Sequence, residues 1–442
     1  MLNPFTPSEI AGTPQPFYGP ETPQLFYGRH SELRELEASL PVGSVLIQGP
    51  VGIGKSSLLS RLMDLMTGFD SAHTGEQVTI VVDKETANAD QAARLVVDGM
   101  FAKITERERN QFKPPASTGA SDVSFEMGVE MARNAQEGRH LAVLKELLEK
   151  DYKRRSTQKT EFLLIGIDEA DKSAAAVARL IRSITTQLQQ VGVRDVRFVV
   201  AGVSPLHQEL LSEDSGVQRA FNRVLTLRPM SAGDADELIW DKLSQVIRQE
   251  EKKGNTLVVH QPVVDRMVEL SGGHPHILQL VGSHLIQHEQ ENPDGVLGLD
   301  DLIGALRRIC YQDRGPVYAS TLHRLENAGK LPSLQKLVGV GPDGLGIASA
   351  KYPTVIPRQL ALDTIGEVDL QWLVERDILV PLSDLEYGLI DELLRVRMIL
   401  DAARPEMRAQ IEQRLLEEGR MVSFDELEQM ANPHQPDHYR VE

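Results

Sequence analysis

The segment at residues 49–56, GPVGIGKS, constrains the fold more than any other part of this chain. It fits the pattern G-x-x-x-x-G-K-[ST], follows an apolar run at 44–48 and opens a helix-periodic run at 56–66, which is the context that the pattern requires. Glycines let backbone N–H groups surround a phosphate, and a helix N-terminus adds partial positive charge. We therefore expect a phosphate-binding loop whose contacts come from Gly49, Pro50, Val51, Gly52, Ile53, Gly54, Lys55, Ser56 and Ser57.

A second motif supplies two carboxylates. The apolar strand expected at residues 162–167 is followed directly by Asp168 and Glu169, which is a Walker B pattern. In this interpretation Asp168 and Ser56 would hold Mg²⁺, Lys55 would reach the β and γ phosphates, and the Glu169 carboxylate would polarise the attacking water. Adjacent positions at a strand tip suit both carboxylates, because one neutralises the metal while the other acts on water. The alternative is an acidic strand-to-loop turn without a catalytic role.

Further candidates lie downstream. The apolar run at 197–201 predicts a strand next to the Walker B strand, and Ser204 just beyond it would either sense the γ-phosphate or cap a loop. Arg219, Arg223 and Arg228 are candidates for an arginine finger, although three arginines near a strand are more often solvated or ion-paired.

Between residues 43 and 230 the chain alternates apolar strands with helix-periodic segments. The expected strands are 44–48, 78–82, 162–167, 197–201 and 224–227, and the clearest helices are 56–66 and 173–190. Short, nearly continuous apolar strands alternating with helices predict a parallel sheet covered by helices on both faces, the α/β core of a P-loop NTPase. The polar stretch 104–138, with Pro114-Pro115, is expected to be an inserted mobile loop.

Together these motifs resemble the signal-transduction ATPases with numerous domains (STAND) and the origin-recognition-like AAA+ ATPases. The resemblance also rests on Phe26-Tyr27-Gly28-Arg29, on Gly273-His274-Pro275, and on the opening Asn3-Pro4-Phe5, which is similar to a group of bacterial ATP-binding proteins. It implies that ATP or ADP and Mg²⁺ are cofactors and that Tyr27, Arg29 and Pro275 border the adenine. The sequence departs from the family at His30, where an acidic residue is usual, and lacks the lid arginine of ring-forming motors, which favours a nucleotide switch.

Five segments are expected along the chain. Residues 1–25 form an extended Pro-rich segment, 26–230 the ATPase core, 231–312 an all-α lid, 313–400 a C-terminal winged-helix domain and 401–442 a charged helical tail. The stretch Ser231–Asp234 predicts a helix cap, and Pro262 suits a first helical turn. In the tail, Phe424, Leu427 and Met430 either form a docking stripe for a partner or pack on their own domain.

Charge bears on the partners. Lys and Arg number 47 and Asp and Glu 64, a net charge of −17, and the segment 321–400 is itself acidic. Because DNA binding needs positive charge against phosphates, this favours a slowly hydrolysing nucleotide switch that controls a separate effector protein or a homo-oligomer. The alternative is an origin- or transposon-type ATPase that binds DNA through its winged helix.

Three features complete the expectations. A single cysteine, Cys310, and the lack of a secretory signal or a run of ~18 apolar residues favour a cytoplasmic protein without a membrane partner. His284 and His288 are four residues apart on an expected helix, and they either share a metal or are ordinary lid histidines.

Overall fold

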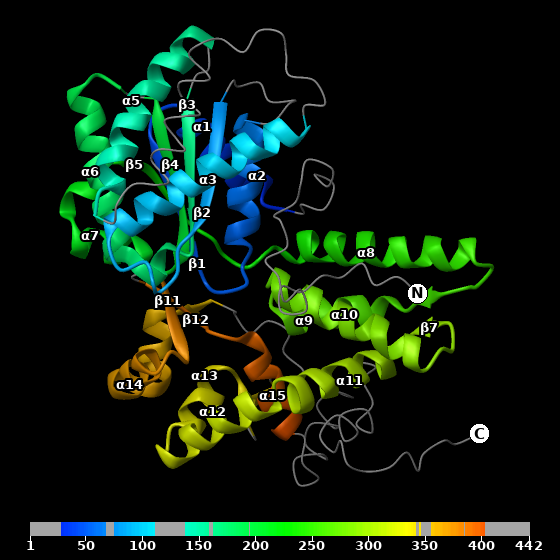
Figure 1. Cartoon of the computed structure of the whole chain (residues 1–442). Helices are drawn as coiled ribbons and strands as arrows, with labels where there is room; N and C mark the ends of the chain where they lie inside the picture. The colour runs from blue at the N-terminus through cyan, green and yellow to red at the C-terminus, as the bar shows by residue number, and fades with distance from the viewer. Residues whose placement is uncertain are drawn as a thin grey trace, which may run out of the picture. The chain divides into compact units, whose positions relative to one another are not determined.

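The computed structural model describes residues 28–67, 75–110, 138–158, 162–193, 195–341, 344–345, 355–383 and 385–402 (Figure 1). Within these ranges the chain divides into two compact units. The first takes residues 28–50 and 54–227, and the second takes Val51–Ile53 and residues 228–402. The Pro-rich segment 1–25, Tyr27 and the tail beyond residue 402 lie outside the described residues, so the expectations for them stay predictions.

A five-stranded sheet forms the centre of the first unit (Figure 1). Its strands are β1 (Ser44–Gly49), β2 (Gly75–Val81), β3 (Phe162–Asp168), β4 (Val196–Val203) and β5 (Phe221–Thr226). The order is β2-β3-β4-β1-β5, and every neighbouring pair is parallel. All seven residues of β3 are buried, as expected for a central strand with both faces covered. The predicted parallel α/β core is therefore confirmed.

Helices cover both faces of this sheet. The unit contains α1 (His30–Ser39), α2 (Lys55–Thr67), α3 (Ala89–Asn110), α5 (His140–Gln158), α6 (Ala174–Gln190) and α7 (Leu206–Glu213), with the short 3₁₀ helices η2 (Ala170–Ser173) and η3 (Ser215–Arg219). Ile165 and Ile167 of β3 share one core cluster with residues of α3, α5 and α6. Gly166 stands between these two isoleucines in the strand, and a Cβ at Gly166 would lie 3.3 Å from the Cε of Met63 in α2. Because successive strand residues face opposite sides, α2 covers the other face.

The expected loop at 104–138 is wrong at its start, because α3 continues to Asn110. Residues 104–110 are polar, but Glu and Arg are good helix formers, and no Pro or Gly interrupts this stretch. Residues 111–137 lie outside the described part. Where the chain resumes, the Asp90 carboxylate of α3 accepts hydrogen bonds from the backbone N–H groups of Gly138 (2.8 Å) and Leu141 (2.9 Å), and thereby caps α5.

Helices dominate the first half of the second unit. These are α8 (Ala232–Lys252), α9 (Gln261–Ser271), α10 (Pro275–Glu291), α11 (Leu299–Arg307) and the π-helical turn η4 (Arg308–Asp313), in which Cys310 is fully buried. The predicted cap is confirmed, since the Ser231 hydroxyl accepts from the Asp234 N–H at 3.1 Å, and Pro262 lies in the first turn of α9. The all-helical expectation is wrong at two places, because β6 (Val258–Val259) pairs in parallel with β7 (Val296–Leu297). These strands are rich in β-branched valine, which favours extended backbone.

The rest of the second unit mixes helices with short strands. Its helices are α12 (Gly315–Asn327), α13 (Leu331–Leu337), α14 (Arg358–Glu375) and α15 (Glu392–Ala402). Its strands are β8 (Val340–Gly341), β9 (Gly344–Leu345), β10 (Ile356–Pro357), β11 (Leu379–Ser383) and β12 (Glu386–Leu389). The last three form an antiparallel sheet in the order β10-β12-β11. Helices α12, α13 and α14 are followed by the hairpin of β11 and β12 and by α15, and the winged-helix interpretation of this region stays a prediction.

Among the helices that the structure describes, none has both the length and the apolar character needed to cross a bilayer.

Candidate functional site

The loop between β1 and α2 has the backbone geometry of a phosphate-binding loop. Gly52 and Gly54 have φ angles of 76° and 96°, which side chains with a Cβ rarely adopt. The side chain of Ile53 is fully buried, whereas Val51 is exposed. Lys55 is the first residue of α2, and Ser56 and Ser57 follow in its first turn, next to the unpaired N–H groups at a helix start.

The ammonium group of Lys55 lies against the loop itself. Its Nζ donates hydrogen bonds to the backbone oxygens of Gly49 (3.0 Å) and Pro50 (2.7 Å). Burial lowers the pKa of Lys55 to about 8, and the nearby carboxylates of Asp171, Asp168 and Glu169 oppose this decrease. The Lys55 ammonium group is therefore buried, and the three carboxylates around it favour its charged form.

Asp168 is the last residue of β3, and its carboxylate is buried beside the start of α2. Its Oδ1 accepts a hydrogen bond from the Glu169 N–H at 2.9 Å, and the Ser56 hydroxyl hydrogen-bonds to the same carboxylate. Burial raises the pKa of Asp168, while these hydrogen bonds act in the opposite direction. The structure thus brings the two predicted metal ligands into contact, and a hydroxyl with a carboxylate is an oxygen donor set that suits Mg²⁺.

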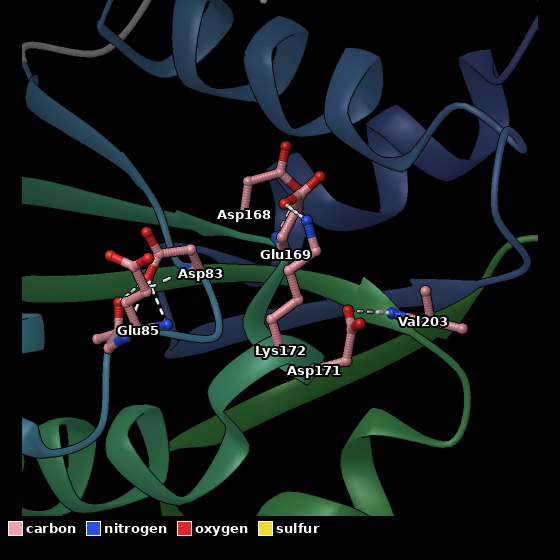
Figure 2. Close-up of polar contacts among 8 residues, drawn as sticks. Asp83, Glu85, Asp168, Glu169, Asp171, Lys172 and Val203 are labelled. Carbon is pink, nitrogen blue, oxygen red and sulfur yellow. Dashed lines mark hydrogen bonds and ion pairs between the residues drawn. The ribbon is translucent and has the colours of Figure 1, made fainter.

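Glu169 begins the turn after β3 in a strained conformation. Its φ and ψ angles are 55° and 32°, in the left-handed region. The side chain forms an ion pair with Lys172, three residues on in η2 (Figure 2). This pair is partly open to solvent, since 44% of the Glu169 side chain and 39% of the Lys172 side chain are exposed.

A second contact fastens the same turn to the neighbouring strand. The Asp171 Oδ1 accepts a hydrogen bond from the Val203 N–H at 2.7 Å, at the end of β4 (Figure 2). The turn and β4 approach each other closely at this point. A Cβ added at Gly202 would lie 2.7 Å from the same oxygen. Sequence reasoning gave no role to Asp171 or Lys172, although both stand within four residues of Asp168 and both carry charge.

Ser204 lies where the sequence predicted, at the end of the strand next to β3. Its N–H donates to the Gly49 oxygen at 3.4 Å, which places it beside the start of the loop. The residue is 7% exposed, and within the described ranges its hydroxyl oxygen has no hydrogen-bond partner. A buried hydroxyl without a partner is unfavourable by itself, so Ser204 is well suited to bind a polar ligand group.

The arginine-finger candidates lie in different settings. Arg219 is exposed at the end of η3. Arg223 of β5 forms an ion pair with Glu35 of α1. Arg228 belongs to the second unit, where it pairs with Glu386 of β12 at 2.6 Å. Arg223 and Arg228 are therefore ion-paired, which was the alternative to a role as an arginine finger.

The residues expected near adenine are only partly described. Tyr27 lies outside the described residues. Arg29 has a φ of 59° and is buried, and its Nη1 pairs with Glu32 at 2.9 Å. Pro275 begins α10 in the second unit.

His284 and His288 of α10 have carboxylate partners. His288 Nδ1 lies 2.9 Å from Asp301, and His284 Nε2 lies 3.3 Å from Asp313. Across the described ranges, no group of three or more His, Cys, Asp and Glu side chains could hold a metal ion.

Known proteins are similar to this chain in part of its sequence and in its fold. Residues 25–200 match the family model described as AAA ATPase domain. The Walker-type ATPase of Pyrococcus abyssi is similar in fold, with a TM-score of 0.51 at 15% identity over 87% of this chain and 99% of that one. The ORC2 protein of Aeropyrum pernix has a TM-score of 0.47 at 12% identity, over 91% of this chain and 98% of that one. No curated protein matches the chain. Residues 25–200 are therefore similar to AAA ATPase domains, and the described residues among them form a parallel α/β fold with the backbone geometry of a phosphate-binding loop.

Proposed function

We propose that this protein binds ATP and hydrolyses it slowly as a nucleotide switch of the STAND type, and that its nucleotide state controls assembly or a partner protein in the cytoplasm. One observation carries the proposal. Lys55, Ser56, Asp168, Glu169 and Ser204 come from three separate stretches of sequence, at the start of α2, at the end of β3 and just after β4, and they meet at the carboxyl end of one parallel sheet. Ligands of open α/β sheets bind at this edge.

Each residue has a proposed role that follows from its surroundings. Lys55 would exchange its two carbonyl partners for phosphate oxygens, and the N–H groups of the loop would bind the same phosphates. Ser56 and Asp168 would hold Mg²⁺, which when bound neutralises phosphate charge. Glu169 would accept a proton from the attacking water, and the unpartnered Ser204 hydroxyl would bind a terminal phosphate oxygen.

The organisation of the chain supports a switch in which separate parts respond to nucleotide. We propose the division into an ATPase core at 26–230, a lid at 231–312 and a winged-helix domain at 313–400. The order of helices α12, α13 and α14 and the hairpin of β11 and β12 supports the last of these. Helix α14 carries four carboxylates and one arginine, which favours a protein partner over DNA at this helix.

Binding of a fluorescent ATP analogue in the presence of Mg²⁺ tests the first step. We expect Lys55→Ala to abolish binding, because the loop then lacks its only ammonium group. Lys84→Ala is the matched control, since Lys84 is an exposed lysine of the same unit. Equal affinity of the wild type and Lys55→Ala would refute ATP binding at this site.

Phosphate release tests the second step. We expect Glu169→Gln to retain binding and to lower turnover by about 10²- to 10⁴-fold, the usual contribution of a general base. Turnover that survives unchanged in Glu169→Gln would remove this residue from the proposed mechanism. The mass in solution with and without a non-hydrolysable analogue, repeated with co-purified partners, then tests whether nucleotide controls assembly.

A further inference from the structure

The turn between β3 and α6 joins the proposed catalytic glutamate to a lysine in two ways. The Lys172 N–H donates to the backbone oxygen of Glu169 at 3.0 Å, and the Lys172 Nζ pairs with the Glu169 Oε2 (Figure 2). The first contact closes the turn, and the second connects the side chains on its surface. Glu169 and Lys172 are three residues apart, and the structure shows that their side chains meet.

The backbone of this turn is fixed on both sides. Asp171 accepts the hydrogen bond from the Val203 N–H of β4, and the Ser173 hydroxyl donates to the backbone oxygen of Thr86. Lys172 lies between these two anchors. The contact between Lys172 and Glu169 can therefore open by rotation of the two side chains, without movement of the backbone.

Such a contact affects a carboxylate that has to act as a base. A hydrogen bond from an ammonium group occupies a lone pair of the Glu169 carboxylate, and a general base needs a free lone pair within reach of the water. The contact also gives the side chain a preferred position at the edge of the turn. Because both side chains are more than a third exposed, the pair is weak and can open during turnover.

We propose that Lys172 is a positioning residue that holds Glu169 in a resting contact and thereby slows ATP hydrolysis. This inference rests on the proposed ATPase function and deepens it, because it assigns part of the slowness of turnover to one named contact. Opening an exposed ion pair changes a rate by at most about fivefold.

The contact can be tested in the protein without nucleotide. A carbodiimide joins a carboxylate and an amine that touch, with loss of one water, and leaves no spacer between them. We expect a Glu169–Lys172 isopeptide, detected by mass spectrometry as a peptide that trypsin no longer cleaves after Lys172. Its absence, under conditions in which the equally spaced pair of Glu250 and Lys253 is joined, would overturn the resting contact.

Kinetics tests the consequence. We expect Lys172→Gln to raise kcat roughly two- to fivefold and to leave the KM for ATP unchanged, because the affected step follows binding. Lys172→Arg should restore the wild-type rate, since it keeps the cation. Lys253→Gln is the matched control, because it removes a lysine from another i,i+3 pair, in the second unit. In a Glu169→Gln background, Lys172→Gln should have no further effect on kcat.

Three outcomes would overturn the inference. If the wild type turns over ATP and Lys172→Gln leaves kcat unchanged or lowers it, the slowing role of Lys172 is refuted and the proposed hydrolysis is not. An increase that persists in the Glu169→Gln background would show that Lys172 acts through another group. Lack of turnover in both the wild type and Lys172→Gln would refute the proposed hydrolysis together with the inference. Far-UV circular dichroism and the urea midpoint of each variant establish that it is folded.

Discussion

Replacing Asp171 by alanine should loosen the carboxyl end of β4. The Asp171 Oδ1 accepts the Val203 N–H at 2.7 Å, a short hydrogen bond to a charged acceptor. Alanine removes the acceptor and leaves the N–H without its partner. Ser204 is the next residue, so the position of its hydroxyl, which has no partner in the described part of the chain, also depends on this contact.

The expected magnitude follows from the type and the exposure of the hydrogen bond. A hydrogen bond to a charged group contributes about 1.5–3 kcal/mol when both partners are buried. Asp171 and Val203 are only partly buried, so water can replace some of the interaction, and we expect a loss of about 1–2 kcal/mol. If opening is local, the Val203 amide should exchange its hydrogen roughly five- to thirtyfold faster.

Hydrogen exchange measured by mass spectrometry on peptides that span residues 196–205 is the direct assay. Asp171→Asn keeps an acceptor oxygen and should fall between the wild type and Asp171→Ala. Asp363→Ala is the control, because this exposed carboxylate of α14 accepts from the Gln359 side chain at 2.9 Å and lies in the second unit. Unchanged exchange in Asp171→Ala would refute the idea that this contact fastens the turn to β4.

Two further predictions concern stability. Phe198→Ala should lower the free energy of unfolding by about 3–5 kcal/mol, because the ring is fully buried in the core of the sheet, and urea denaturation measures this against the exposed control Val191→Ala. The hydrogen bond to Asp301 raises the pKa of His288 above 6.5, so its stabilisation is fully present below pH 6.5 and is lost as the pH rises through the raised value. The urea midpoint should therefore fall less between pH 6 and 8 in His288→Gln than in the wild type. A pH dependence of the midpoint equal to that of the wild type and of the exposed control His323→Gln would contradict this role of the His288–Asp301 contact.

Much of the first unit could be predicted from the sequence, because its strands are buried on both faces. Such strands appear as continuous apolar runs, and the run at 44–48 gave β1 to within one residue. The start of β2 was missed, since residues 75–77 are Gly, Glu and Gln. Among the described strands β2 lies at the edge of the sheet, and polar residues are tolerated there because no described strand pairs with one of its sides.

The residues of the candidate site also divide into some that the sequence could predict and some that it could not. Lys55, Asp168 and Ser204 follow apolar strands or open a helix, so the topology of a parallel sheet brings them together without further information. The roles of Asp171 and Lys172 depend on the conformation of one turn and on its distance from β4. Sequence spacing does not encode the contact of Asp171 with β4, because it results from tertiary packing. For the same reason the sequence could not show that Arg223 pairs with Glu35, 188 residues earlier.

The burial of Cys310 has a practical consequence for experiments on this protein. It is the sole cysteine among the 442 residues, and burial raises the pKa of its thiol to about 12. Maleimides react with the thiolate, so this side chain should stay unmodified at neutral pH. A cysteine introduced at the exposed positions Lys84 and Val317, one in each unit, can then carry a pair of spectroscopic probes in an otherwise unaltered chain. The distance between the two units can thus be followed through a nucleotide cycle without first removing a native thiol.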